Sequence, residues 1–190
     1  MIRRIFFLLI ILISLVTSTA KADSWAIKSN LLYDAAGAPN LGIEYGWKGH
    51  WSLTADATIP WWVDKNNEWC YEMVNVGVEA RYWLKNWQEK DTPLHGHYFG
   101  LYGNGGCFDF GHDCMGWQSK WFLATGISYG YNFRLSNHLR LECMLGIGYL
   151  NTDYTRYNTS DDKKGIYFVE EGNFSWFGPT KAGVTLMWVF

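Results

Sequence analysis

The sequence predicts an all-β protein, an eight-stranded antiparallel transmembrane β-barrel of the small outer-membrane type. Three observations predict this fold. Apolar and polar residues alternate at period two in eight segments bounded by Gly, Pro, Asn and Asp. The chain ends inside such a segment, on Phe190. Aromatic residues make up 18% of the chain, a richness that suits the aromatic girdles at both membrane interfaces.

Residues 1–22 have the pattern of a secretory signal, which leaves residues 23–190 as one mature domain. Their apolar stretch, 5–16, is too short to span a bilayer as a helix. The small residues that follow favour cleavage after Ala22, with Ala20 as the alternative. Cleavage after Ala22 removes three basic residues and no acidic ones, so the formal charge falls from −2 to −5. We expect no nucleic-acid partner, because such proteins need a basic surface.

The first four predicted strands alternate clearly. They cover, in order, residues 26–33, 40–47, 51–59 and 72–84. Their apolar faces carry Ile27 and Tyr33; Leu41, Ile43 and Tyr45; Trp51, Leu53 and Ile59; and Val74, Val76 and Val78. Polar residues or glycines lie between them, as in Ser52, Thr54 and Asp56 of the third strand. Each segment therefore has one face suited to lipid and one suited to a polar interior.

The last four predicted strands cover residues 97–105, 121–133, 139–149 and 181–190. The strand 97–105 is the weakest, because Tyr98 and Tyr102 fall on its polar face. The other apolar faces carry Leu123, Ile127 and Tyr129; Leu141, Cys143 and Leu145; and Ala182, Val184 and Leu186. We expect Cys143 to be a free, buried small hydrophobe. No segment has a convincing amphipathic-helix pattern.

The terminal strand resembles the assembly signal of outer-membrane barrels. The residues that form this signal are Lys181, Gly183, Leu186, Trp188 and Phe190. A soluble domain rarely ends on an exposed apolar strand, because such an edge recruits other chains. The last strand of a membrane barrel instead pairs with the first and faces lipid. The sequence therefore predicts a bacterial outer-membrane location, with membrane lipid and the barrel-assembly machinery as partners.

The connections alternate in length, as in bacterial barrels with short periplasmic turns and longer outer loops. Residues 48–50 and 136–138 form the predicted short turns, and the predicted long loops are 60–71, 106–120 and 150–175. With both termini in the periplasm, all three long loops fall outside. Two connections depart from this rule, because the outer loop 34–39 is short and the periplasmic turn 85–95 is long.

The polar faces predict a charged barrel interior. The inward charges are Lys28, Glu44, Asp56, Glu79, Arg81, Arg140, Glu142 and Lys181, four acids and four bases. An eight-stranded barrel is just wide enough for side chains to fill it, and unpaired charges there would be costly. We therefore expect a network of ion pairs that closes the lumen, with a narrow pore or an ion-binding site as the alternative.

One predicted loop, 106–120, contains residue types that could carry chemistry. Cys107 and Cys114 are the candidate disulfide pair, because both fall in one predicted loop of an exported chain. With Asp109, His112 and Asp113 they have metal-ligand types, but the spacing matches no strong zinc pattern, so we expect no metal and no other cofactor. No G-x-S-x-G motif or nucleotide-binding fingerprint is present, so we expect no catalytic residues.

Several motifs occur together over nearly all of the mature chain. They are Ser29–Asp34, Pro39–Glu44, Trp51–Leu53, Pro60–Trp62, Glu79–Trp83, Ser128–Tyr131 and Phe177–Gly183. In this combination the chain resembles an uncharacterised (domain-of-unknown-function) family of Gram-negative outer-membrane β-barrel proteins. Some members lie beside genes for fimbrial subunits, so the resemblance implies a link to surface adhesion or fimbrial assembly. It implies no catalytic residue.

The favoured interpretation is a non-enzymatic outer-membrane barrel with a structural or surface-interaction role, and a fimbrial or other surface protein as partner. One alternative is an outer-membrane enzyme that acts on lipid or peptide at the barrel rim. Another is a soluble, lipocalin-like barrel with its apolar faces inward. Alternation alone does not decide which face is inward. Phe190 and the aromatic richness of the apolar faces favour lipid outside.

Overall fold

The protein is almost entirely β-structure in a computed structural model that describes residues 24–63, 69–85, 93–112, 115–159 and 166–190. The predicted signal 1–22 lies outside the described residues. The elements are β1 (Ser24–Asn30), α2 (Leu31–Ala35), β2 (Asn40–Trp47), β3 (Trp51–Thr58), β4 (Trp61–Val63), β5 (Trp69–Trp83), β6 (Gly96–His112), β7 (Met115–Arg134), β8 (Leu139–Thr159) and β9 (Ile166–Val189). No helix among the described residues is long and apolar enough to cross a membrane.

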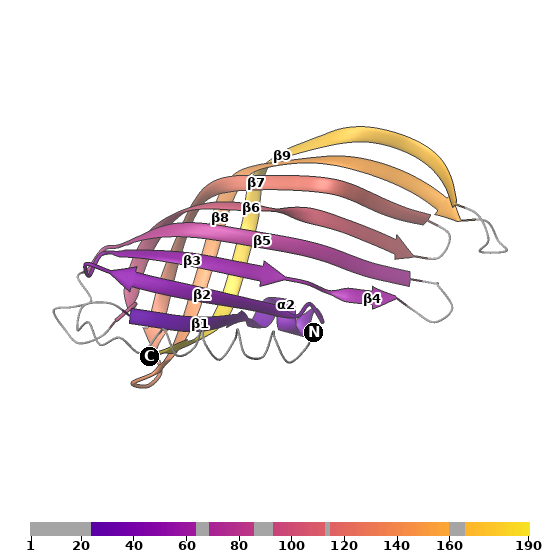
Figure 1. Ribbon diagram of the computed structural model, residues 1–190. Coiled ribbons are helices and arrows are strands. Elements are labelled where there is room, and N and C mark those ends of the chain that lie inside the picture. The colour runs from indigo at the N-terminus through magenta and orange to yellow at the C-terminus, as the bar shows by residue number, and fades with distance from the viewer. Residues whose placement is uncertain (1–23, 64–68, 86–92, 113–114, 160–165) are drawn as a thin grey trace, which may run out of the picture.

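The strands form one antiparallel sheet that closes into a ring (Figure 1). Its order is β1-β2-β3-β5-β6-β7-β8-β9, and β9 returns to pair with β1. The short β4 lies beyond the end of β3 and pairs with β5. This confirms the all-β prediction and the expected pairing of the terminal strand with the first one.

The two faces of the ring differ in polarity. Alternate apolar residues point outward and are exposed, as with Leu53 at 49% and Ile127 at 67%. The residues between them point inward, where Glu44 and Glu142 have no exposed surface. The inward apolar faces of the lipocalin-like alternative are therefore wrong. The prediction of a buried Cys143 is also wrong, since that thiol is exposed on the apolar outer face.

Two of the predicted long loops are strand instead. β6 and β7 continue to His112 and Met115, and β8 and β9 together cover residues 139–159 and 166–189. The prediction failed there because register shifts interrupt the period of two. They lie between Gly106 and Phe108, between Gln118 and Phe122 and, where β8 pairs with β9, between Arg156 and Tyr157. A bulge moves the following residues to the opposite face, so the alternation no longer reads as one strand.

A short helix replaces the predicted end of the first strand. Strand β1 stops at Asn30, where we expected it to reach residue 33. The Asn30 side chain accepts a hydrogen bond from the Leu32 N–H at 3.1 Å, which is an N-cap interaction. The five-residue helix α2 was missed because one turn is too short to show helical periodicity.

The long strands project well beyond the ring on one side (Figure 1). We call this projection the sheet extension. Strand β3 ends at Thr58, which is paired across the sheet with a row of residues on the neighbouring strands. The extension is the part of the sheet beyond this row. It consists of 61–63, 69–74, 107–112, 115–121, 153–159 and 166–173. Strands β1 and β2 contribute nothing to it, since β1 ends opposite Thr185. The extension is therefore a one-sided wall with an open edge at β9.

Candidate functional site

The interior of the ring holds a network of buried ion pairs centred on Arg81. Its Nη1 lies 2.6 Å from an oxygen of Glu142 and 3.0 Å from one of Glu44, and its Nη2 lies 3.2 Å from one of Glu79. These residues come from β2, β5 and β8, because each strand turns its polar face inward. All four side chains are at most 1% exposed. The planar guanidinium suits this role, since its donors can serve several carboxylates at once.

Two lysines extend the network to other strands. Lys28 Nζ on β1 lies 3.1 Å from Glu44 and 3.3 Å from Glu142. Lys181 Nζ on β9 lies 2.8 Å from Glu79 and 3.7 Å from Asp56 of β3. The network therefore connects β1, β2, β3, β5, β8 and β9 through the centre of the ring.

Hydroxyl groups satisfy the remaining carboxylate oxygens. Ser52 donates to Glu44 at 2.6 Å, and Ser128 donates to Glu79 at 2.5 Å. A Cβ atom at Gly100 would collide with the Glu79 carboxylate and the Ser128 hydroxyl, so only glycine leaves room there. This inward glycine is thus part of the site, because it makes space for the charged side chains.

Seven of the eight predicted inward charges join the network, and Arg140 does not. Arg140 is 1% exposed, but its Nη1 donates to the backbone carbonyls of Ser136 at 2.6 Å and Asn137 at 3.3 Å. It forms no ion pair with the residues that the structure describes. The predicted inward position of Arg140 is confirmed, but its predicted ion pairing is wrong, because the side chain lies beside the β7–β8 turn and donates to the carbonyl groups there.

An apolar floor closes the interior on the side of the short turns. The floor consists of Ala26, Trp83, Leu94, Tyr98, Met187 and Val189. The Arg81 guanidinium lies 4.3 Å from the centre of the Tyr98 ring, a cation–π contact that joins the network to the floor. On the side of the network away from the floor is a cavity of about 40 Å³, lined in part by Asp56, Asn104 and Lys181. Such a volume suits one or two water molecules.

The residues of the predicted assembly signal lie on both faces of β9. Leu186, Trp188 and Phe190 point outward, whereas Lys181 and Gly183 point inward. The Phe190 N–H donates to the Trp25 carbonyl at 2.9 Å, so the last residue takes part in closing the ring.

The cysteines lie differently from the prediction. Cys107 lies exposed within β6, five residues before the end of that strand, and is not bonded to either of the other described cysteines, Cys70 and Cys143, so its pairing with Cys114 stays a prediction. Cys114 and Asp113 lie outside the described residues. Within the part of the chain that the structure describes, no three His, Cys, Asp or Glu side chains come together as metal ligands.

One polar cluster in the extension was missed. The Tyr157 hydroxyl donates to Asp109 at 2.6 Å, and the Cys70 thiol lies 3.8 Å from both groups. Burial and the Asp109 carboxylate raise the pKa of Tyr157, and burial raises the pKa of the Cys70 thiol. Both groups therefore keep their protons at neutral pH. No sequence motif marks this cluster, because its members come from β5, β6 and β8.

Comparison with known proteins identifies the family. A family model described as "Protein of unknown function (DUF3575)" matches residues 6–190. The search of curated proteins finds no match. Since the family model covers nearly the whole chain, the protein belongs to this family of unknown function.

Proposed function

We propose that the ring is a transmembrane β-barrel of the bacterial outer membrane with a non-enzymatic role in surface interaction. Its lumen is closed by ion pairs, and its extension presents a contact surface outside the cell. One observation carries this proposal: a closed ring has exposed apolar side chains on its outside and buried charges on its inside. Water would favour the opposite arrangement, whereas lipid favours this one.

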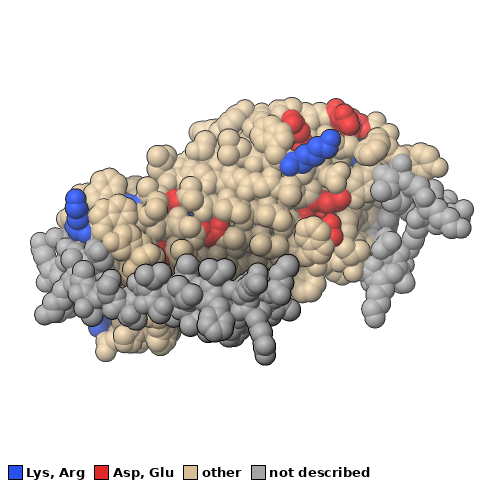
Figure 2. All heavy atoms as spheres, viewed as in Figure 1, with Lys and Arg blue, Asp and Glu red and all other residues tan. Residues whose placement is uncertain are grey.

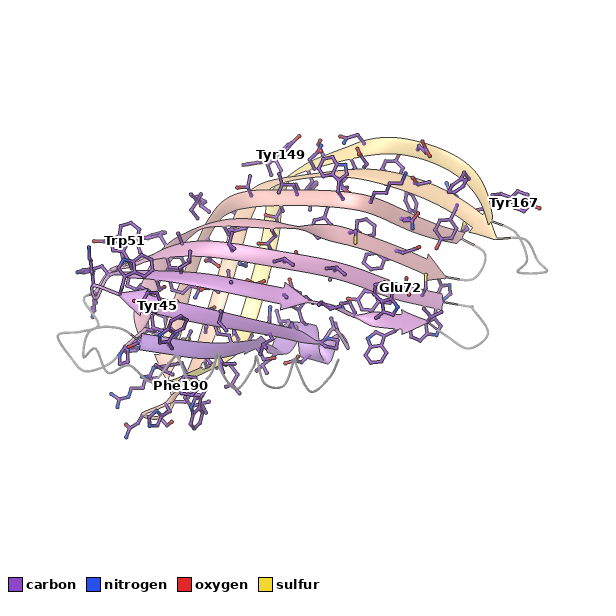
Figure 3. All side chains as sticks on the ribbon, in the orientation of Figure 1. Tyr45, Trp51, Glu72, Tyr149, Tyr167 and Phe190 are labelled. Atoms are coloured by element: carbon purple, nitrogen blue, oxygen red, sulfur yellow. The ribbon has the colours of Figure 1, made fainter. Side chains whose placement is uncertain are left out.

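The distribution of aromatic residues supports the membrane assignment. Trp51 and Tyr82 pack at 5.1 Å, and His138 and Trp188 stack at 5.5 Å, near the end that carries the short turns. Figure 3 shows Tyr45, Trp51 and Phe190 toward this end, with Tyr149 and Tyr167 farther along the long strands. Outward aromatic side chains at this level suit the interfacial girdle of a barrel.

The lengths of the strands support an outer projection. A strand needs about 9–11 residues to cross the hydrocarbon layer at the usual tilt. Strands β2 and β3 have 8 residues each, whereas β8 has 21 and β9 has 24. The surplus lies in the extension, on the side away from the start of β1 and from Phe190. With the termini in the periplasm, it faces the outside, where a fimbrial or other surface protein would be its partner.

The interior favours a closed barrel over the narrow pore. The Arg81 network crosses the lumen, and the apolar floor lies directly beneath it. The two described lumen hydroxyls that donate to carboxylates, those of Ser52 and Ser128, are at most 2% exposed, so a substrate cannot reach them. We therefore favour a binding role over the rim enzyme. The proposed partners are accordingly lipid, the barrel-assembly machinery and a surface protein.

Cell fractionation with heat-modifiable electrophoresis tests the proposal. We expect the protein in the outer-membrane fraction, with faster migration before boiling than after. Recovery as a soluble periplasmic protein would overturn the membrane assignment. A planar-bilayer recording of the purified protein tests the closed lumen separately, and steady conductance at neutral pH would favour the pore.

A further inference from the structure

The open edge of β9 is the largest unpartnered backbone surface in the described part of the chain. Strand β9 pairs with β8 along its whole length, but with β1 only from Thr185 to Val189. Asn30 covers the next stretch, where its amide donates to the Ala182 carbonyl and its oxygen accepts from the Val184 N–H, both at 3.3 Å. From Ile166 to Lys181, a length of about 50 Å, the open side has no described strand beside it.

The register shows which residues point to this open side. The Asn30 contacts show that Ala182 and Val184 direct their backbone groups away from β8. The register between β8 and β9 shifts by one residue between Gly146 and Ile147. Beyond this shift, the odd-numbered residues of β9 direct their backbone groups to the open side, beginning with Pro179. Proline has no N–H to leave unpaired, so it is well placed there. Four further residues with this orientation lie before the next register shift, and their N–H and C=O groups face no described strand: Phe177, Ser175, Asn173 and Glu171.

The charge of the extension limits what can bind there. Its described charged residues are the acids Glu72, Asp109, Asp153, Glu170 and Glu171 and the bases Lys120 and Arg156. Acidic patches are visible toward this end in Figure 2. A second copy docked along the same edge would bring another extension with this excess of acids beside the first, and like charges oppose that approach. A strand with basic residues would be attracted instead.

We propose that residues 171–177 of β9 dock an extended, basic segment of another polypeptide, which adds to the sheet as a further strand. Backbone hydrogen bonds to the four free residues supply the affinity, and alternate side chains of the guest supply the specificity. Exposed aromatic residues lie on both faces of the site itself, among them Phe174 at 49% and Phe177 at 74%. The inference rests on the proposed function, which places the extension outside the cell, and with it the end of this edge that carries Glu171 and Asn173.

Fluorescence anisotropy with the purified full-length protein in detergent tests the proposal. The probe is a blocked peptide of about eight residues that alternates Lys and Val, and the control peptide has Glu in place of Lys. Saturable binding of the Lys peptide and not of the Glu peptide is expected. No binding up to about millimolar concentration, or equal binding of both, would overturn the proposal.

Two variants at one position separate strand addition from simple charge attraction. Glu171→Pro removes the side-chain charge together with an N–H that the sheet does not use, and Glu171→Ala removes the charge alone. We expect roughly tenfold weaker binding for the proline variant and only a few-fold weakening for the alanine variant. Equal losses would refute strand addition.

The remaining controls keep the inference distinct from the proposed function. The unboiled gel shift shows whether the Glu171→Pro ring is intact; if it is not, Ser175→Pro replaces it. Reversible dimers that Glu171→Pro abolishes would assign the edge to a second copy and overturn our choice of partner. Loss of peptide binding by a protein that still fractionates with the outer membrane would leave the barrel assignment standing.

Discussion

Replacement of Arg81 with methionine should strongly destabilise the folded ring. Arg81 contacts three carboxylates, those of Glu44, Glu79 and Glu142, at 2.6–3.2 Å, and all are at most 1% exposed. Without the guanidinium, the three buried carboxylates have only the ammonium groups of Lys28 and Lys181 as described cationic partners. Removing one partner of a buried ion pair costs about 3–5 kcal/mol, because it leaves an uncompensated charge. We expect Arg81→Met to lower the free energy of unfolding by an amount in that range.

The assay is urea unfolding of the protein in lipid vesicles, followed by tryptophan fluorescence. Arg81→Lys is the matched control: it keeps the charge but loses the forked geometry, so it should cost less. Adding Glu142→Gln to Arg81→Met should recover part of the loss, because it neutralises the closest of the three carboxylates. The deficit of Arg81→Met should also shrink as the pH falls, since protonation removes the same unpaired charge. A cost below about 1 kcal/mol, the level of a surface pair, would refute a buried network.

Three further changes test other parts of the structure. Deletion of Phe190 should lower the yield of inserted protein, measured as the heat-modifiable fraction, because it removes the terminal hydrogen bond to Trp25; an unchanged yield would contradict the assembly role. Gly100→Ala should cost about 1–3 kcal/mol of unfolding free energy through its clash with Glu79 and Ser128, whereas Gly103→Ala, with nothing nearby, should cost much less. Tyr157→Phe should cost about 1 kcal/mol at pH 8 by removing the hydrogen bond to Asp109. Because the pKa of Tyr157 is raised, the folded protein keeps a phenolic proton that the unfolded chain loses above about pH 10. The stability that the Tyr157–Asp109 hydrogen bond contributes is therefore complete below that pH and declines above it. An equal difference between the wild type and Tyr157→Phe at pH 8 and pH 11 would contradict that assignment.

Much of the ring was predictable because period-two alternation is a local signal. Strand β2 has the predicted bounds, 40–47, and the other predicted strands all overlap observed ones. Alternation also placed Glu44, Glu79, Arg81 and Glu142 on the polar faces, and the closed ring then brings these faces together. Local pattern failed where bulges change the face of a strand, and the sheet extension was therefore taken for loops.

The sequence alone determined that the chain is all-β, which residues share a face, and that the last strand is built to pair. Each is a property of neighbouring residues, so the pattern contains it. Only the tertiary structure decided that the polar faces turn inward and that β9 extends past β1. It also decided that Arg81 pairs with three carboxylates, whereas Arg140 donates to the carbonyl groups of a turn. These features depend on ring closure and register, which bring together residues as far apart as Lys28 and Glu142.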